Sequence, residues 1–573
     1  MGDYRLIELL GEGGLGQVWR VQHELFEEVD LALKVMHERH VLDEAKRVAF
    51  ANEIKAMARI DHPGVVKIFD AGTLEEDGDP DELGASRPTN GPYFIMEMAR
   101  DGSLFQNALA LDLDAILGLS FAALDALGHA HARGVIHRDI KPANLLVGWE
   151  GQASVLKISD FGLSNVYGED DAALGWGTPD YMAPEQLSGR WREQGPWTDL
   201  FALGSMLHEF ITGKRPYTLG SLSGIAQIDG ARSWQPSRID GFDEELEAWL
   251  ERMVARDPRA RFMCAAEASW TLARAAGLSE PLGWDAANTL LGMSLERAKG
   301  PARNEPVKPI ATTVPHDVTT SRPEHTPPEA LIIDITPPPW TPTWRAGIRG
   351  VEERPSLLFA PRIHHLREIR ESARIHERDR LWSALSRVID SEHHAPRVML
   401  LEGPRGVGKS RLAGWFVKRV RELGVARHLA VRYSDPIGPF DGLLVALAEM
   451  LAVQGLEGQR LRRALARAPR GFEFLEIDEL ERVATLLESQ HHFSSRRREL
   501  SHLDRYEVIG SLLERASATR PIVITVENAH LGSEGLFFIR YLLRRPALSM
   551  RVLFLLMPRQ DELEQRDLEA GLL

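Results

Sequence analysis

Residues 135–146 read VIHRDIKPANLL, and this stretch places Arg138, Asp139, Lys141 and Asn144 between two apolar ends. An ordinary surface loop could carry this much charge. So could a loop that holds a phosphate, a metal ion and a hydroxyl group together. In the second case Asp139 accepts or orients a hydroxyl proton, Lys141 neutralises a phosphoryl group and Asn144 gives an amide oxygen to Mg²⁺.

Two further acids and a lysine fit the second interpretation. Asp160 ends the apolar stretch VLKISDFGLS, where a carboxylate can bridge a second Mg²⁺ to phosphates. Lys34 lies in the strand-like run LALKVM, and a buried lysine needs an acidic partner. Glu53, in the helical stretch 45–60, can pair with Lys34 and leave its amine near the α- and β-phosphates of ATP. Taken alone, Glu53 also fits a solvated helix face.

The stretch LLGEGGLGQVW spaces Gly11, Gly13 and Gly16 as G-x-G-x-x-G. Glycines let backbone amides approach phosphate oxygens, although a plain hairpin turn explains the same spacing. The flanking runs YRLIELL and GQVWRVQ are strand-like. This strand–turn–strand context favours a flap over phosphates rather than a dinucleotide-binding fold, in which a helix would follow the glycines.

Five motifs occur in the same order as in one known family: GEGGLGQV, LALK, HRDIKPAN, DFG and GTPDYMAPE. Residues 4 to about 277 therefore resemble the catalytic domain of bacterial serine/threonine (Hanks-type) protein kinases. The resemblance implies a two-lobed α+β fold with ATP in the cleft between the lobes. It also implies transfer of the ATP γ-phosphate to protein serine and threonine hydroxyls with Mg²⁺, in bacterial signal transduction.

The resemblance assigns roles to individual residues. Asp139, Lys141, Lys34 and Glu53 form the catalytic set, while Asn144 and Asp160 bind the metal. Glu185 is available to pair with Arg261, and Asp199 matches a helix-capping aspartate with a structural role. The residues assigned to ATP binding are Gly11, Glu12, Gly13, Gly14, Leu15, Gly16, Val18, Ala32, Lys34, Met96, Glu97 and Met98.

One departure from the family lies in the segment LSNVYGEDDAALGWG, residues 163–177, which has no threonine ahead of Thr178. In the family, an arginine such as Arg138 commonly receives an activating phosphate. We hypothesise that one acid among residues 169–171 replaces that phosphate. The alternative is a solvated acidic loop tip.

A second nucleotide site is predicted near residue 400. The stretch RVMLLEGPRGVGKSRLAGWF is a strand, a glycine-rich loop and the start of a helix. The loop amides can cradle phosphates, the lysine reaches the β- and γ-oxygens, and the serine binds Mg²⁺. The P-loop residues are Gly403, Gly406, Gly408, Lys409 and Ser410.

The P-loop requires a second strand that ends in an acid, and PIVITVENAH supplies Glu527 and Asn528. An asparagine binds metal or water but takes no proton, so we expect slow hydrolysis and a nucleotide-binding switch. Arg559, after a third strand, could sense the γ-phosphate. The region resembles AAA/STAND-type ATPase modules, and we expect it to be incomplete at its C-terminus.

The 573 residues exceed one ordinary core, and composition divides them into three parts. We predict a kinase domain over residues 1–280, a Pro/Thr-rich extended linker over 281–365 and an α/β P-loop ATPase domain over 366–573. The apolar run 113–132 is interrupted by two aspartates and predicts an amphipathic, mostly buried helix.

Charge and composition exclude several classes. A net charge of −15 argues against nucleic-acid binding, and one cysteine rules out an internal disulfide. No apolar run reaches the ~18 uncharged residues that a membrane helix needs. We therefore expect a cytoplasmic protein with ATP, Mg²⁺ and protein substrates as partners, a second ATP at the P-loop, no nucleic acid and no membrane.

Two rival functions use the same motifs. In one, the chain is a nucleotide-dependent signalling scaffold that mainly phosphorylates its own linker, at the threonines of IATTVPHDVTT and DITPPPWTPTW. In the other, a P-loop NTPase carries an inert kinase relic. The complete catalytic set disfavours the relic.

Overall fold

The computed structural model describes most of the two predicted domains. The described residues are 4–12, 16–24, 26–74, 91–99, 111–150, 153–161, 179–222, 225–229, 241–299, 375–390, 394–404, 406–436, 441–467, 477–488, 501–545 and 549–559. Three features named above lie outside these residues: the acids at 169–171 on which the hypothesis about the missing phosphate rests, Thr178, and the linker threonines.

The first domain begins with an antiparallel sheet in the order β1-β2-β3-β5-β4. Side chains alternate between its two faces, so Leu31, Leu33 and Val35 enter one apolar cluster while Ala32 and Met36 enter another. The elements are β1 (Tyr4–Glu12), β2 (Gly16–His23), β3 (Phe26–Met36), α1 (Glu38–Val41), α2 (Glu44–Ala58), β4 (Ile68–Leu74) and β5 (Gly91–Glu97).

Helix α2 begins at Asp43, whose carboxylate accepts a hydrogen bond from the Lys46 amide at 3.2 Å. Its Phe50 ring packs against Phe94 of β5 with ring centroids 5.3 Å apart. This contact fixes the helix against the sheet face that carries Lys34, which positions Glu53 of α2 for the site described below.

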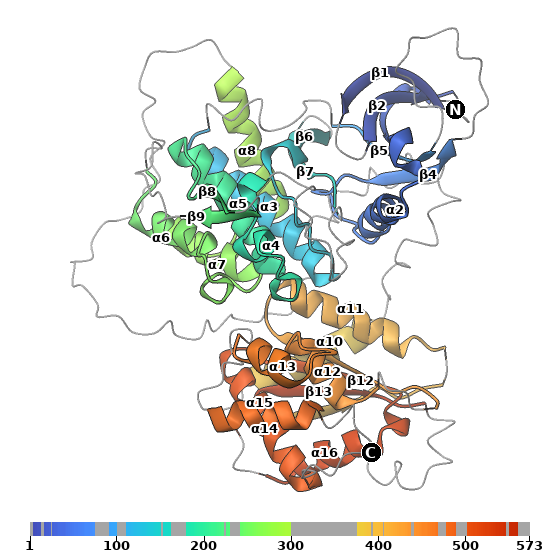
Figure 1. The fold of residues 1–573 in the computed structure, drawn as a ribbon, viewed down its shortest axis with the longest axis vertical. Helices are drawn as coiled ribbons and strands as arrows, with labels where there is room; N and C mark the ends of the chain where they lie inside the picture. The colour runs from blue at the N-terminus through green and yellow to red at the C-terminus, as the bar shows by residue number, and fades with distance from the viewer. Residues whose placement is uncertain are drawn as a thin grey trace.

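A mainly helical unit follows and surrounds the long helix α3 (Figure 1). Fifteen residues of α3 are buried, which confirms the predicted buried helix. The elements are α3 (Leu113–Ala132), η2 (Pro142–Asn144), β6 (Leu145–Glu150), β7 (Ala153–Ile158), η3 (Pro179–Tyr181), α4 (Pro184–Leu187), η4 (Trp191–Glu193), α5 (Pro196–Thr212), β8 (Thr218–Leu222), β9 (Ile225–Asp229), α6 (Glu244–Met253), η5 (Pro258–Ala260), α7 (Ala265–Ala275) and α8 (Trp284–Lys299).

Helix α8 extends this unit past the boundary predicted at residue 280. Its Asn288 accepts a hydrogen bond from the backbone amide of Leu156 in β7 at 2.8 Å. Leu291 and Trp284 are buried in the same apolar cluster as α3. The packed unit therefore reaches Lys299, because α8 covers apolar surface of α3 and β7.

One helix in the described part of the chain, α3, has the length and apolar composition that a membrane crossing requires. Within the protein, 78% of that helical window is already buried. Its apolar residues pack against α5, α7 and α8 as the central helix of the unit.

The second domain contains a sheet of four strands in the order β10-β13-β12-β11, all parallel. This confirms the predicted α/β fold. The elements are α10 (Ile375–Ile389), β10 (Arg397–Leu400), α11 (Lys409–Glu422), β11 (Arg427–Arg432), α12 (Leu443–Met450), α13 (Gly458–Leu465), α14 (Ile477–Glu488), α15 (His502–Thr519), β12 (Ile522–Glu527), η7 (Ala529–Leu531), α16 (Ser533–Leu543) and β13 (Val552–Met557).

Helices cover both faces of this sheet. Val523 and Leu555 face α10 and α11 in one apolar cluster, whereas Ile524 and Phe554 face the helices from α12 to α16 in the other. Figure 1 shows the second domain (orange to red) below the helical unit, with α11 at the junction. The P-loop helix is therefore also the helix nearest to the first domain.

Candidate active site and nucleotide sites

The amine of Lys34 lies between two carboxylates. Its Nζ is 2.7 Å from Glu53 Oε1 of α2 and 2.6 Å from Asp160 Oδ1, which follows β7. Lys34 is on the sheet face that turns toward α2, because strand alternation directs it opposite to Leu33 and Val35. The predicted Lys34–Glu53 pair is present, and Asp160 joins the sheet to the helical unit through the same amine.

The charged groups of Lys34, Glu53 and Asp160 shift one another's pKa values. Burial would lower the pKa of the Lys34 ammonium, but the carboxylates of Asp160 and Glu53 outweigh burial and raise it. Burial would raise the pKa of Asp160, yet Lys34 keeps it below its ordinary value. Burial raises the pKa of Glu53 to about 7, because one ammonium cannot fully compensate two buried carboxylates.

The raised pKa of Glu53 predicts a pH-dependent difference between the wild type and Glu53→Gln. Between the ordinary value of 4.5 and about 7, the folded protein holds a proton that the unfolded chain has lost. The Glu53 contribution to the free energy of unfolding therefore decreases as pH rises through this window, by up to about 3 kcal/mol. Urea unfolding of wild type and Glu53→Gln from pH 4.5 to 8 measures the difference between their free energies of unfolding. A difference that stays constant across the series contradicts the raised pKa.

The predicted catalytic loop brings its three functional side chains together. Lys141 Nζ donates to Asp139 Oδ2 at 2.7 Å, and Asn144 Nδ2 donates to the same oxygen at 3.1 Å. Asn144 Nδ2 also donates to the Asp139 carbonyl at 2.8 Å. Because its amide nitrogen is directed to Asp139, the amide oxygen is the atom that Asn144 can offer to a cation.

The backbone at Arg138 and at Asp160 adopts an unusual conformation that brings the catalytic loop next to Asp160. Arg138 and Asp160 have positive φ values of 66° and 60°, which few residues other than glycine adopt. The Ser159 amide donates to the Asn144 carbonyl at 3.0 Å, which links the catalytic loop to the residue preceding Asp160. Strained backbone of this kind persists where surrounding contacts hold it, and it is typical of functional sites.

Asp199 supplies those contacts, and its predicted role as a helix cap is wrong. It lies inside α5, whose N-cap is Gly195. Its fully buried carboxylate accepts from the backbone amides of His137 at 2.8 Å and Arg138 at 2.6 Å. His131 Nε2 contacts the same carboxylate at 2.7 Å. Asp199 thus fixes the catalytic loop.

His131 and His137 are site residues that the sequence reasoning missed. His137 Nδ1 accepts from the Asp139 amide at 3.2 Å, and its Nε2 lies 2.7 Å from the Ser159 carbonyl. The ring therefore connects the catalytic loop to the strand end that carries Asp160. The signal that could have found His137 is its position two residues before Asp139.

Several of the predicted ATP-binding residues lie on the strands beside Lys34. Val18 pairs with Lys34 across β2 and β3, and Ala32 pairs with Met96 across β3 and β5. Val18, Ala32, Met96 and Met98 share one apolar cluster, an environment that suits an aromatic base. Gly11 and Glu12 end β1, and Gly16 begins β2. Gly13, Gly14 and Leu15, between the two strands, lie outside the described residues.

Glu97 has a structural partner that the sequence did not reveal. Its carboxylate lies 2.8 Å from Lys157 Nζ of β7, and its backbone amide donates to the Lys67 carbonyl at 2.8 Å. Glu97 therefore ties the end of the sheet to the helical unit, next to Met96 and Met98.

Mg²⁺ fits the side chains of this site. The described residues contain no cluster of three or more acidic, histidine or cysteine side chains that would hold a metal without help. Mg²⁺ commonly takes only one or two protein carboxylates and completes its shell with water and substrate phosphates. Asp160, with the amide oxygen of Asn144, provides such a set.

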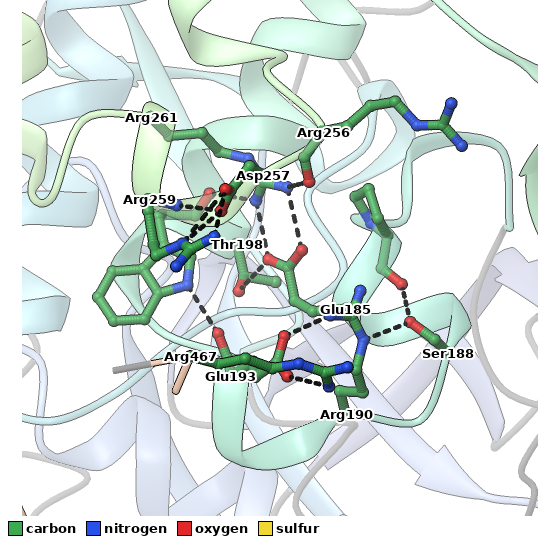
Figure 2. Close-up of polar contacts among 12 residues, drawn as sticks. Glu185, Ser188, Arg190, Glu193, Thr198, Arg256, Asp257, Arg259, Arg261 and Arg467 are labelled. Atoms are coloured by element: carbon green, nitrogen blue, oxygen red, sulfur yellow. Dashed lines mark hydrogen bonds and ion pairs between the residues drawn. The ribbon is translucent and has the colours of Figure 1, made fainter. Parts of the chain in front are cut away.

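The predicted Glu185–Arg261 ion pair is present and fully buried (Figure 2). Arg261 Nη1 and Nη2 donate to the two Glu185 oxygens at 2.8 and 3.0 Å. Thr198 donates to Glu185 Oε1 at 2.9 Å. Helix α4, which carries Glu185, also supports the catalytic loop, because the side-chain Nε2 of Gln186 donates to the Arg138 carbonyl at 2.8 Å.

The P-loop of the second domain lies between β10 and α11, as predicted. Gly403, Gly406 and Gly408 have φ values of 140°, 81° and 98°, which the tight loop requires. Lys409 is the first residue of α11, and its Nζ donates to the carbonyls of Gly403 and Pro404. Ser410 is exposed in the first turn of α11, where helix amides favour phosphate.

Glu527 ends β12 and Asn528 follows it, and β13 separates β12 from the P-loop strand β10. Glu527 is partly exposed and lies 3.5 Å from Arg432. Asn528 has a φ of 51°, and its Nδ2 donates to the Tyr433 carbonyl at 2.8 Å. Asn528 therefore shapes this turn, and Glu527 is the acid that ends the strand. Their predicted action on a metal or water stays a prediction.

Comparisons with known proteins identify both domains. The model of the protein kinase domain family matches residues 4–270, and that of the AAA ATPase domain family matches residues 374–555. The DNA damage-responsive serine/threonine-protein kinase RqkA of Deinococcus radiodurans is 32% identical over 287 residues. Serine/threonine-protein kinases pkn3 of Myxococcus xanthus and PknB of Mycobacterium tuberculosis are 30% and 28% identical.

These alignments cover 48%, 44% and 47% of this chain and 40%, 45% and 42% of the three relatives, in that order. The chain therefore matches less than half the length of each relative. Residues 4–270 match the protein kinase domain family and are similar to bacterial serine/threonine-protein kinases, and residues 374–555 of the same chain match the AAA ATPase domain family.

Proposed function

We propose that this chain transfers the γ-phosphate of ATP to serine and threonine hydroxyls of proteins, and that its P-loop domain binds a second ATP and regulates the transfer. The observation that carries the proposal is the contact of Lys34 with both Glu53 and Asp160. Kinase chemistry needs this arrangement, because the lysine must hold the phosphates while the second acid binds their metal.

The side chains divide the chemistry between them. Mg²⁺ bound with ATP would neutralise phosphate charge, with Asp160 and Asn144 as its protein ligands. Asp139 orients the acceptor hydroxyl and receives its proton, and Lys141, 2.7 Å from Asp139, stabilises charge on the transferring group. Lys34 holds the α- and β-phosphates in line with that hydroxyl.

We further propose a cytoplasmic setting without nucleic-acid or membrane partners. The net charge of −15 disfavours binding to a phosphate backbone. The single cysteine fits a reducing compartment. The alternative function, a scaffold that mainly phosphorylates itself, uses the same site and differs only in which hydroxyls receive the phosphate.

Transfer of labelled γ-phosphate to a generic basic protein tests the proposal. We expect label on serine and threonine with wild type and with Lys409→Ala, and loss of at least 100-fold with Asp160→Asn, because the metal-binding carboxylate is gone. Equal transfer by wild type and Asp160→Asn would reject the kinase site. Phosphosite mapping in the same reaction decides the alternative, since label confined to the linker identifies the scaffold.

A further inference from the structure

The end of the P-loop helix packs against the first domain. Glu422, the last residue of α11, lies 3.0 Å from Nδ1 of His129 in α3. The His129 side chain is 1% exposed and that of Glu422 is 12% exposed. Arg421 Nη2 donates to the His131 carbonyl at 3.3 Å. A charged helix end that is buried in this way indicates a specific contact rather than a loose one.

A second contact lies beside the first. Arg520, which follows α15, donates to Glu267 Oε2 at 3.3 Å and to the sulfur of Cys264 at 3.5 Å. Gly424 has a φ of 67°, and a Cβ there would lie 2.9 Å from the Cys264 sulfur. The two domains therefore approach each other closely around Cys264, the single cysteine of the chain.

A third contact forms the exposed edge of this surface. Arg467 Nη1 lies 3.2 Å from Glu193 Oε1, a pair that Figure 2 shows below the Glu185–Arg261 pair. Arg192 Nη1 donates to the Gln454 carbonyl at 2.7 Å. Exposed pairs of this kind contribute little energy, but they fix orientation.

Elements at or next to these first two contacts also carry the predicted nucleotide residues. Helix α11 begins at Lys409 of the P-loop and ends at Glu422 in the interface, about 20 Å away at 1.5 Å per residue. Strand β12 begins at Ile522, two residues after Arg520, and ends at Glu527. A rigid helix and a central strand therefore join the nucleotide site to the first domain.

On the kinase side, the contact leads to the catalytic loop. Arg421 binds the backbone of His131, and the His131 ring contacts Asp199. Asp199 accepts from the amides of His137 and Arg138, directly before Asp139. A displacement of the end of α11 would thus be transmitted to Asp139 through the last turn of α3 and the buried carboxylate of Asp199.

We propose that nucleotide binding at the P-loop is coupled to the kinase catalytic loop through the docking of α11 and Arg520 on α3 and α7. This inference rests on the proposed function for its output but not for the docking itself. Lys409 binds the Gly403 and Pro404 carbonyls, and a triphosphate competes with them for its amine. ATP therefore pulls on the first residue of α11 and loosens the docked end.

Alkylation of Cys264 by iodoacetamide, followed by mass spectrometry, measures docking. The experiment uses the full chain with Asp139→Asn, so that no phosphate transfer intervenes. We expect Mg²⁺ with ATP to accelerate alkylation about 3- to 10-fold, and Lys409→Ala to abolish this acceleration. In Arg520→Glu, Cys264 should be alkylated fast with or without ATP. The new carboxylate faces Glu267, and the repulsion between the two acids separates the docked surfaces.

The matched control is Arg545→Glu, which reverses an arginine that pairs with Glu507 inside the second domain. It should behave like the parent protein. If Arg520→Glu does not fold, Glu422→Gln replaces it, since this change keeps the shape and removes the charge facing His129. An ATP effect that is absent, or that persists in Lys409→Ala, would overturn the coupling.

The effect of docking on phosphate transfer, called here the kinase arm of the proposal, is measured separately in chains that retain Asp139. We expect Arg520→Glu to change kcat for phosphate transfer at least threefold relative to Arg545→Glu. An unchanged kcat beside ATP-dependent alkylation would show that the coupling ends at the interface and would overturn the kinase arm. Absence of transfer in every chain would reject the proposed function while the alkylation result still decides the docking.

Discussion

The Asp139→Asn variant is expected to transfer phosphate with a kcat about 10³-fold below that of wild type. A positioned general base contributes roughly 10²–10⁴-fold to the rate of an enzymatic reaction. An asparagine keeps the shape of the side chain, but it takes no proton and does not compensate the Lys141 ammonium 2.7 Å away. Steady-state kinetics on the full chain measure the effect.

The split between kcat and KM makes this prediction specific. Asp139 acts on the acceptor hydroxyl, while Lys34 and Asp160 bind the nucleotide side, so KM for ATP should change less than about threefold. Asp114→Asn serves as control, because Asp114 is an exposed carboxylate on α3 that pairs with Arg297 of α8. A raised KM with unchanged kcat would assign Asp139 to binding rather than to proton transfer.

The sequence predicted the kinase site well because its residues are functional types at fixed spacing. Lys34 and Glu53 are 19 positions apart, and a lysine within an apolar strand calls for an acid. Asp139, Lys141 and Asn144 lie within one turn-rich loop, so their proximity follows from the chain itself. Glu185 and Arg261 were predicted to pair from their opposite charges, and the structure confirms the pair.

Other features leave no periodic signal in the sequence. The order β10-β13-β12-β11 depends on how crossover helices return, and apolar strand patterns do not encode it. Asp199 looks like a first-turn helix acid, and only the fold shows that its carboxylate faces the catalytic loop. The His129–Glu422 contact joins residues 293 positions apart, each of which alone fits an ordinary helix residue.

Replacement of Arg261 by methionine is expected to destabilise the kinase domain by about 3–5 kcal/mol. Both Arg261 and Glu185 are fully buried, and the change leaves the Glu185 carboxylate without its bidentate partner. It also removes donors to the carbonyls of Ala255, Trp197 and Arg256. The lost cation–π contact with Phe201, at 4.5 Å, adds to the effect.

Pulse proteolysis in urea, read on fragments from residues 4–299, measures this loss within the full chain. Arg259→Met is the matched control, because Arg259 pairs with Asp257 at the surface and should cost no more than about 1 kcal/mol. The double variant Glu185→Gln with Arg261→Met should recover part of the stability, since no buried charge then remains unpaired. If the double variant is less stable than Arg261→Met alone, the unpaired carboxylate is not the origin of the loss, and the missing carbonyl donors are.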